Sequence, residues 1–513
     1  MKDSPPNGTG KPDEAELGLD DFAKNLWDTL ERLRVASGLR FDEYGKTVLG
    51  LTLLGFVNQQ VSMDGRFRDK TMLPDHARWD HLLTQSESTI GDAINSAMSG
   101  IASENTWLNV AITADYNRTE NRALIELVRI FADVTKKATD NTFGALYEIF
   151  LDRFANAAGQ RSGEFSTPRE IASLLASVLK PQGGMSVYDP CFGTGGFLLE
   201  VSRYATGSST DLKLKLFGQD INRETLSLGQ MHLAVNGIFD ASLGLGNTLT
   251  SPYHTGDGRL LQFDRVIANP PFSAEFRGID FAEDPFEQFP YGTPPSRNAN
   301  FAFIQHMLSS LRPDGRMATV VPHNVLFCGG REGDIRQAIL KDDLVEAVIG
   351  LPSNLFYGTS IAAAILVCNK AKASNRAGKV LFINADRDFE RSQQRNTLRP
   401  EHVERIINVF DSFSEIERFS RVSSIEEIAA NNFNLHIPRY ADSSPLAGLV
   451  THYDNFAKFT IKDLAVEINS ANHGTTFENK KKCDLRSDFR EVTHREYRSS
   501  GGEASRALSS CLQ

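Results

Sequence analysis

An amide, two prolines and an aromatic ring, Asn269-Pro270-Pro271-Phe272, end a run that reads as a buried strand. Proline has no N–H to donate, so the pair stops the strand and stiffens the turn after it. The side-chain carbonyl of Asn269 and a backbone carbonyl of the Asn269-Pro270 segment can then converge on one NH₂ group. Two such acceptors favour a pyramidal nitrogen that can attack a methyl sulfonium. Phe272 can stack on a planar substrate. The tetrapeptide therefore indicates methyl transfer to an amine, and a plain Asn-Pro-Pro turn is the alternative.

A glycine-rich stretch, DPCFGTGGF at 189–197, follows the first strand-like run and opens a helical pattern. Gly193, Gly195 and Gly196 allow a tight turn and let the backbone approach a ligand with no Cβ in the way. Such loops hold pyrophosphate in dinucleotide enzymes, but Asp189 would repel a phosphate here. S-adenosylmethionine carries an ammonium and a sulfonium and has no phosphate, so it suits the loop better. An ordinary strand-to-helix turn remains the alternative.

Two further polar residues follow strand-like runs. Asp220, in FGQDIN, ends the second run, where a carboxylate can accept both ribose hydroxyls of an adenosine. It could instead cap the helix that starts near Asn222. Asn247, in GNTL, follows a short strand-like piece and could bind the adenine edge, although a turn residue is an equal alternative.

The elements that must position these residues alternate between strands and helices. Seven runs predict strands, at 185–190, 215–221, 264–270, 316–322, 344–352, 362–369 and 379–386. Several are apolar throughout, as strands covered on both faces tend to be. This alternation predicts an α/β fold with a doubly wound, mostly parallel, seven-stranded sheet, and ligands bind such sheets at the strand ends. Ahead of the first strand, FSTPREIASLLASVLKP predicts a helix with Thr167 as N-cap and Pro168 at its first position.

The pattern along the chain predicts four regions. Residues 1–16 are rich in Pro, Gly and acids and are expected to be disordered. Residues 17–140 show helical periodicity without a convincing strand, so we expect an all-helical N-terminal domain. The strand and helix alternation defines a third region at 141–440, and 441–513 is a polar C-terminal tail.

Composition excludes several classes of protein. A net charge of −10 argues against a chain that coats nucleic acid by charge alone, although a local basic groove or a partner subunit could still hold DNA. No apolar run is long enough to span a membrane, and the N-terminus has no signal-peptide core. The five cysteines form no CxxC pair, so no metal site is predicted, and a reducing cytoplasm fits best.

The motifs together resemble a known family. In their order, EFSTPRE, DPCFGTGGF, FGQDIN and NPPF are similar to the modification (M) subunits of type I restriction–modification systems, which are adenine-N6 DNA methyltransferases. The resemblance covers about residues 20–440 and extends to NFNLHIPRY at 432–440. It implies a Rossmann-like methyltransferase sheet behind the helical N-terminal domain, with S-adenosylmethionine as cofactor.

The resemblance also implies roles for individual residues and partners. The segment that would contact the methionine portion of the cofactor is Glu164, Phe165, Ser166, Thr167, Pro168 and Arg169. Asp189, Gly193, Thr194, Gly195 and Gly196 would shape the cofactor loop, Asp220 would bind the ribose, and Asn269, Pro270, Pro271 and Phe272 would hold the target adenine. The implied partners are double-stranded DNA with a flipped adenine, a specificity subunit at two M per S, and a restriction subunit. The tail would include part of the docking region for the specificity subunit.

Two other function classes remain open at this point. An N-methyltransferase acting on a protein glutamine or on RNA would use the same chemistry. A non-catalytic subunit that binds DNA or a partner is the third possibility.

Overall fold

The structure, a computed structural model, describes residues 14–38, 40–108, 114–158, 167–206, 213–272, 284–356, 361–392 and 395–442. The chain divides into two compact units, residues 1–443 and 444–513, and all described residues belong to the first. The expected tail from 441 therefore lies almost wholly outside the described residues, as does the stretch before Glu14. No helix among the described residues is both long and apolar enough to cross a membrane.

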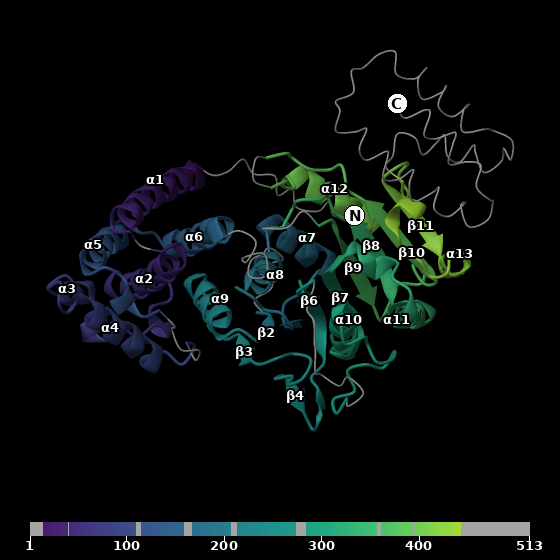
Figure 1. Ribbon diagram of the computed structural model, residues 1–513, viewed down its shortest axis with the longest axis horizontal. Coiled ribbons are helices and arrows are strands. Elements are labelled where there is room, and N and C mark those ends of the chain that lie inside the picture. Colours follow the sequence, from purple (N-terminus) through teal and green to yellow (C-terminus); the bar gives the residue numbers. More distant parts are fainter. Residues whose placement is uncertain are drawn as a thin grey trace, which may run out of the picture. The chain divides into compact units, whose positions relative to one another are not determined.

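The described residues between 14 and 158 form helices and turns, without a strand (Figure 1). The helices are α1 (Glu14–Ala36), α2 (Phe41–Ser62), α3 (Trp79–Leu82), α4 (Ile90–Glu104), α5 (Asn121–Lys137) and α6 (Thr142–Ala158). Helix α5 illustrates why this part of the chain is helical. Its apolar residues recur at helical spacing, and they form a buried face with Leu124, Leu127, Val128 and Phe131. Together with α2 and α6, this face of α5 forms one hydrophobic core.

A nine-stranded sheet forms the centre of the remaining part, in the order β11-β10-β8-β9-β7-β6-β1-β2-β3. Strand β9 runs antiparallel to β7 and β8, and β11 runs antiparallel to β10, while the other neighbours are parallel. The strands are β1 (Ser186–Asp189), β2 (Lys215–Asp220), β3 (Ser242–Leu245), β6 (Phe263–Ala268), β7 (Leu311–Pro322), β8 (Val345–Gly350), β9 (Ala363–Asn369), β10 (Lys379–Asn384) and β11 (Ser420–Ser424). A separate hairpin pairs β4 (Thr255–Gly256) with β5 (Arg259–Leu260).

The doubly wound, mostly parallel α/β architecture is confirmed, but the expected count of seven strands is wrong for this sheet. All seven predicted runs form strands, namely β1, β2, β6, β7, β8, β9 and β10. The two additional strands, β3 and β11, lie at the two edges. β3 has only four residues, and β11 is the polar run SRVSS, so neither carries the apolar signal of a strand covered on both faces.

Helices cover both faces of the sheet. Alternate residues of each central strand belong to two different cores: Val187, for example, packs with α7, α8 and α12, whereas Tyr188 packs with α10 and α11. These helices are α7 (Arg169–Leu179), α8 (Gly196–Thr206), α10 (Asn300–Ser309), α11 (Gly330–Lys341) and α12 (Pro400–Ser412), and a short α13 (Ile425–Ala430) follows β11. Helix α9 (Arg223–Val235) lies between the sheet and the helical region, because Leu226 faces the sheet core and Met231 joins the core of α2, α5 and α6.

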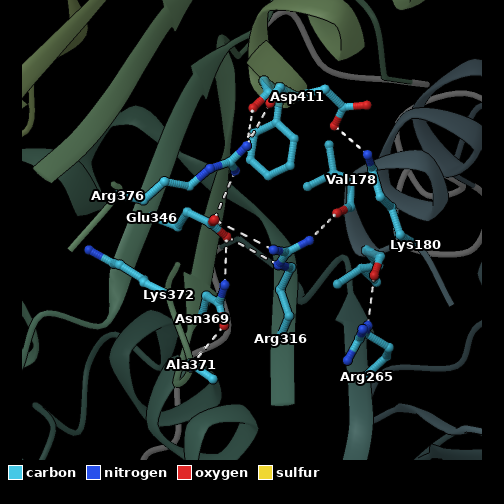
Figure 2. Close-up of polar contacts among 12 residues, drawn as sticks. Val178, Lys180, Arg265, Arg316, Glu346, Asn369, Ala371, Lys372, Arg376 and Asp411 are labelled. Carbon is cyan, nitrogen blue, oxygen red and sulfur yellow. Dashed lines mark hydrogen bonds and ion pairs between the residues drawn. The ribbon is translucent and has the colours of Figure 1, made fainter. Parts of the chain in front are cut away.

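A buried ion network lies near the amino-terminal end of β8 (Figure 2). Glu346 is fully buried and binds two arginines: its Oε2 is 3.1 Å from Arg316 Nε, and its Oε1 is 2.9 Å from Arg376 Nη1. The same guanidinium groups donate to carbonyls at helix C-termini, Arg316 to Val178 of α7 and Arg376 to Asp411 of α12. The network therefore ties α7 and α12 to one end of the sheet. This end lies opposite the carboxyl ends of β7 and β8.

Candidate active site

The predicted polar residues lie at the carboxyl ends of neighbouring parallel strands. Asp189 ends β1, Asp220 ends β2, and Asn269 directly follows β6. In the sheet β1 lies between β2 and β6, so these three ends are adjacent. The chain order turns back at this point, since β2 and β3 extend from one side of β1 and β6 lies on the other. Ligands of doubly wound sheets bind at such a switch point.

The glycine-rich loop between β1 and α8 encloses an aromatic ring. Phe192 is buried in the sheet core, and its backbone N–H donates to Gln219 O at 2.9 Å. A Cβ on Gly195, whose φ is +79°, would lie 2.8 Å from this ring, so Gly195 is required by the packing of Phe192 as well as by the turn. A Cβ on Gly196 would meet no atom within 4 Å. The open side of the loop is therefore at Gly196, where α8 begins.

Two carboxylates line the base of this loop, and their environment distinguishes between possible ligands. Asp189 is fully buried: its Oδ1 accepts from Cys191 N at 2.9 Å, whereas its Oδ2 makes no hydrogen bond among the described residues. Burial raises the pKa of Asp189 well above its ordinary value, and it also raises that of Asp220. No Lys or Arg of the described residues forms an ion pair with either group. A cation-bearing ligand such as S-adenosylmethionine fits this setting, and a phosphate does not.

The tetrapeptide after β6 lies at the same edge. Asn269 is half-buried, and its Nδ2 donates to Thr167 Oγ1 at 3.1 Å. The end of β6 is held by β7, since Ala268 pairs with Thr319, whose hydroxyl donates to Ala268 O at 3.2 Å. Phe272 is half-buried and meets the Phe356 ring edge-to-face, with ring centroids 6.0 Å apart. Asn269 thus has a fixed backbone, and one side of the Phe272 ring already has a partner.

The segment predicted to contact the cofactor is described in part. Glu164, Phe165 and Ser166 lie outside the described residues. Thr167 was expected to be the N-cap of the next helix, which is wrong: Pro168 is the N-cap and α7 starts at Arg169. Arg169 Nε donates to Glu200 Oε1 at 3.0 Å, so its side chain ties α7 to α8.

Asn247 lies after β3 at the next strand end, and its Oδ1 accepts from Leu249 N at 2.9 Å. This bond closes a turn, as the alternative reading expected. Gln219 of β2, which was not predicted from the sequence, holds the loop that follows β3. Gln219 is buried, its Nε2 donates to Gly246 O and Ser251 O, and its Oε1 accepts from Tyr253 N. The available signal was a polar side chain in the interior of a predicted strand.

His232 on α9 was also missed, and it supports the glycine-rich loop. It is buried, its Nδ1 lies 2.8 Å from Thr194 O, and its ring stacks on Tyr147 of α6. Tyr147 in turn donates to Leu228 O of α9 at 2.9 Å. Thr194 is therefore joined through His232 to the helical part of the chain. Burial lowers the pKa of His232, which favours the neutral ring.

Comparison with known proteins gives the family. The model of the N-6 DNA Methylase family matches residues 138–447, more than half of the chain. The chain belongs to this family. Among its relatives, the type I restriction enzyme HindI methylase subunit of Haemophilus influenzae is 35% identical over 312 residues, covering 59% of this chain and 68% of the relative. The MjaIX methylase subunit of Methanocaldococcus jannaschii is 30% identical over 390 residues, covering 72% and 69%.

A solved structure agrees with these relatives. The methyltransferase subunit of a type I restriction–modification system from Streptococcus thermophilus superimposes with a TM-score of 0.71 at 26% identity, and the match covers 83% of this chain and all of that one. The resemblance to type I modification subunits is thereby confirmed, and with it the activity of a DNA adenine-N6 methyltransferase.

Proposed function

We propose that this chain, as the modification subunit of a type I system, methylates N6 of an adenine flipped out of duplex DNA, with Asn269 as the residue that holds the amine. The observation that carries the proposal is the position of Asn269, directly after β6 and beside the glycine-rich loop at the point where the strand order reverses. When bound, S-adenosylmethionine supplies an electrophilic methyl group on a sulfonium.

Residues of the tetrapeptide after β6 hold the target adenine in two ways, by hydrogen bonds to its amine and by stacking on its ring. Asn269 Oδ1 and a backbone carbonyl of the Asn269-Pro270 segment accept the two N6 hydrogens, which localises the nitrogen lone pair. Phe272 stacks on the adenine with its ring fixed by Phe356. A stacked base in a duplex cannot reach a strand end, so the adenine must leave the helix.

The cofactor is assigned to the loop between β1 and α8. Gly196 leaves space for the ligand, the carboxylates of Asp189 and Asp220 favour a cation, and Asp220 accepts hydrogen bonds from the ribose hydroxyls. Asn247 binds the adenine edge of the cofactor through its Nδ2, because its Oδ1 already closes the turn with Leu249 N. Thr167, Pro168 and Arg169 are assigned to the surroundings of the methionine end. The net charge of −10 leaves much of the DNA binding to partner subunits. These partners are a specificity subunit, with two modification subunits for each one, and a restriction subunit in the full complex.

The test uses the full chain co-expressed and co-purified with a type I specificity subunit. Tritiated methyl transfer to DNA, followed by nucleoside digestion, should give N6-methyladenine. Asn269→Ala should lower the rate at least about 100-fold, because the acceptor acts in the transition state, while calorimetric binding of S-adenosylmethionine stays unchanged. Asn408→Ala, at an exposed site on α12, is the matched control. Full activity of Asn269→Ala, or label only in RNA or protein, would refute the proposal.

A further inference from the structure

The hydroxyl of Thr167 meets the amide of Asn269 across a long separation in the sequence. Asn269 Nδ2 donates to Thr167 Oγ1 at 3.1 Å, between residues 102 positions apart. Thr167 does not cap α7, because Pro168 occupies the N-cap position and no side chain caps the helix. The hydroxyl of Thr167 is therefore directed to Asn269, at the carboxyl end of β6, and not to the helix that Thr167 precedes.

The backbone of Thr167 is held by the residues that follow it. Pro168 O accepts from the N–H groups of Ile171 and Ala172 at 3.0 and 3.1 Å, which anchors the first turn of α7. In the same turn, Glu170 Oε1 lies 2.5 Å from Arg395 Nη1 in an ion pair, and both side chains are mostly buried. Thr167 thus offers Asn269 a hydroxyl at a fixed position.

In the structure the Asn269 amide is oriented with its Nδ2 toward the hydroxyl of Thr167. Rotation of an asparagine amide by 180° exchanges its NH₂ for its carbonyl oxygen, and the two ends have opposite hydrogen-bonding character. An adenine N6 amine needs an acceptor, so only the orientation with Oδ1 toward the substrate is productive. A hydrogen bond from Nδ2 to Thr167 holds the donor end away and leaves Oδ1 on the other side.

We propose that Thr167 is a positioning residue for methyl transfer, which selects the acceptor-forward orientation of the Asn269 amide. The proposal rests on the proposed role of Asn269 as the acceptor for the amine. It differs from the expected cofactor contact of Thr167, because it places the effect of the hydroxyl on the chemical step and not on cofactor affinity.

The experiment compares Thr167→Val, which keeps the shape and removes the hydroxyl, with Thr167→Ser, which keeps the hydroxyl. Both are made in the full chain bound to its specificity subunit, and thermal midpoints check folding. Thr167→Val should lower kcat for methyl transfer about 10-fold, the effect of one lost orienting hydrogen bond. The KM for S-adenosylmethionine should stay within twofold, and Thr167→Ser should retain at least half of the activity.

The same Thr167 variants in an Asn269→Asp protein distinguish the positioning role of Thr167 from the acceptor role of Asn269. In Asn269→Asp both side-chain oxygens are acceptors, so no orientation needs selecting. Thr167→Val should therefore cause a clearly smaller loss there than in the unaltered chain, because only the contact of the hydroxyl with the carboxylate is removed. An undiminished kcat in Thr167→Val, a change confined to KM, or the same 10-fold loss in both backgrounds would overturn the positioning role. Failure of the parent proposal has a different signature, which is full activity of Asn269→Ala.

Discussion

The carboxylate of Asp220 and the backbone of Gly193 join two neighbouring strand ends. Asp220 Oδ2 accepts from Gly193 N at 2.9 Å, and its Oδ1 accepts from Asn222 N at 2.8 Å. Each oxygen has a second lone pair for a ribose hydroxyl. The same side chain therefore fixes the glycine-rich loop and keeps lone pairs for a ligand. The alternative that Asp220 caps the next helix is wrong, because Asn222 is the N-cap of α9 and its Oδ1 accepts from Glu224 N.

Asp220→Asn should weaken cofactor binding about 10-fold or more. An amide has only one oxygen, so either Gly193 or Asn222 loses its acceptor, and the carboxylate charge is lost as well. Isothermal titration calorimetry with S-adenosylmethionine measures the effect. Asp240→Asn, at an exposed site after α9, is the matched control. Equal affinities for Asp220→Asn and the unaltered chain would contradict the assignment.

Asp189→Asn should stabilise the ligand-free protein while weakening its cofactor binding. Burial raises the folded-state pKa of Asp189 above its ordinary 3.8, so the folded state binds more protons than the unfolded state between these two values. The stability of the ligand-free protein therefore falls as pH rises through that window. Asparagine keeps an oxygen for Cys191 N and has no charge to bury, so we expect a gain of about 1 kcal/mol at pH 7.

Thermal melts of Asp189→Asn without cofactor, at several pH values from 4 to 8, measure this difference. The gain over the unaltered chain should grow as pH rises and vanish at the acid end. Glu287→Gln, an exposed acid of the described chain, should show no such trend. A lower midpoint for Asp189→Asn at pH 7 would show that the carboxylate is stabilising.

His232→Leu should weaken cofactor binding, and His232→Asn should largely preserve it. Asparagine can place its Nδ2 near the position of the histidine Nδ1 and donate to Thr194 O, whereas leucine cannot.

Because burial lowers the folded-state pKa of His232, the unfolded state binds more protons below about pH 6.5. Stability is therefore lost as pH falls through this window, and both substitutions should reduce that loss. Melts from pH 5 to 7.5 together with calorimetry test both points.

Much of the candidate site could be predicted because strand ends are set by short-range signals. Asp189, Asp220 and Asn269 each follow an apolar run, and the parallel arrangement puts such ends on one edge. The role of Thr167 could not be predicted in this way. Thr-Pro before a helical pattern is a local N-cap signal, but the backbone places Pro168 at that position, and the partner of the hydroxyl lies 102 residues away. The burial of Phe192 likewise depends on glycines of three separate elements.

The ion network around Glu346 could not be predicted from the sequence either, and we expect its loss to destabilise the protein. Arg316, Glu346 and Arg376 come from β7, β8 and the turn after β9, and nothing local in their sequence pairs them (Figure 2). Glu346→Gln removes the charge between two mostly buried guanidinium groups. Breaking a buried pair in this way costs about 3 kcal/mol or more, because the remaining charges lose their compensation.

Urea unfolding, followed by fluorescence, should therefore show a clearly lower midpoint for Glu346→Gln. Glu390→Gln breaks the exposed pair with Arg399 and should leave the midpoint almost unchanged, since solvent screens such pairs. Methyl transfer at a temperature where both variants are folded should stay within twofold of the unaltered chain, because the network lies at the opposite end of the strands from Asn269. An unchanged midpoint for Glu346→Gln would mean that the two arginines are satisfied by the helix carbonyls alone, and a selective loss of activity would mean that the two ends of the sheet are coupled.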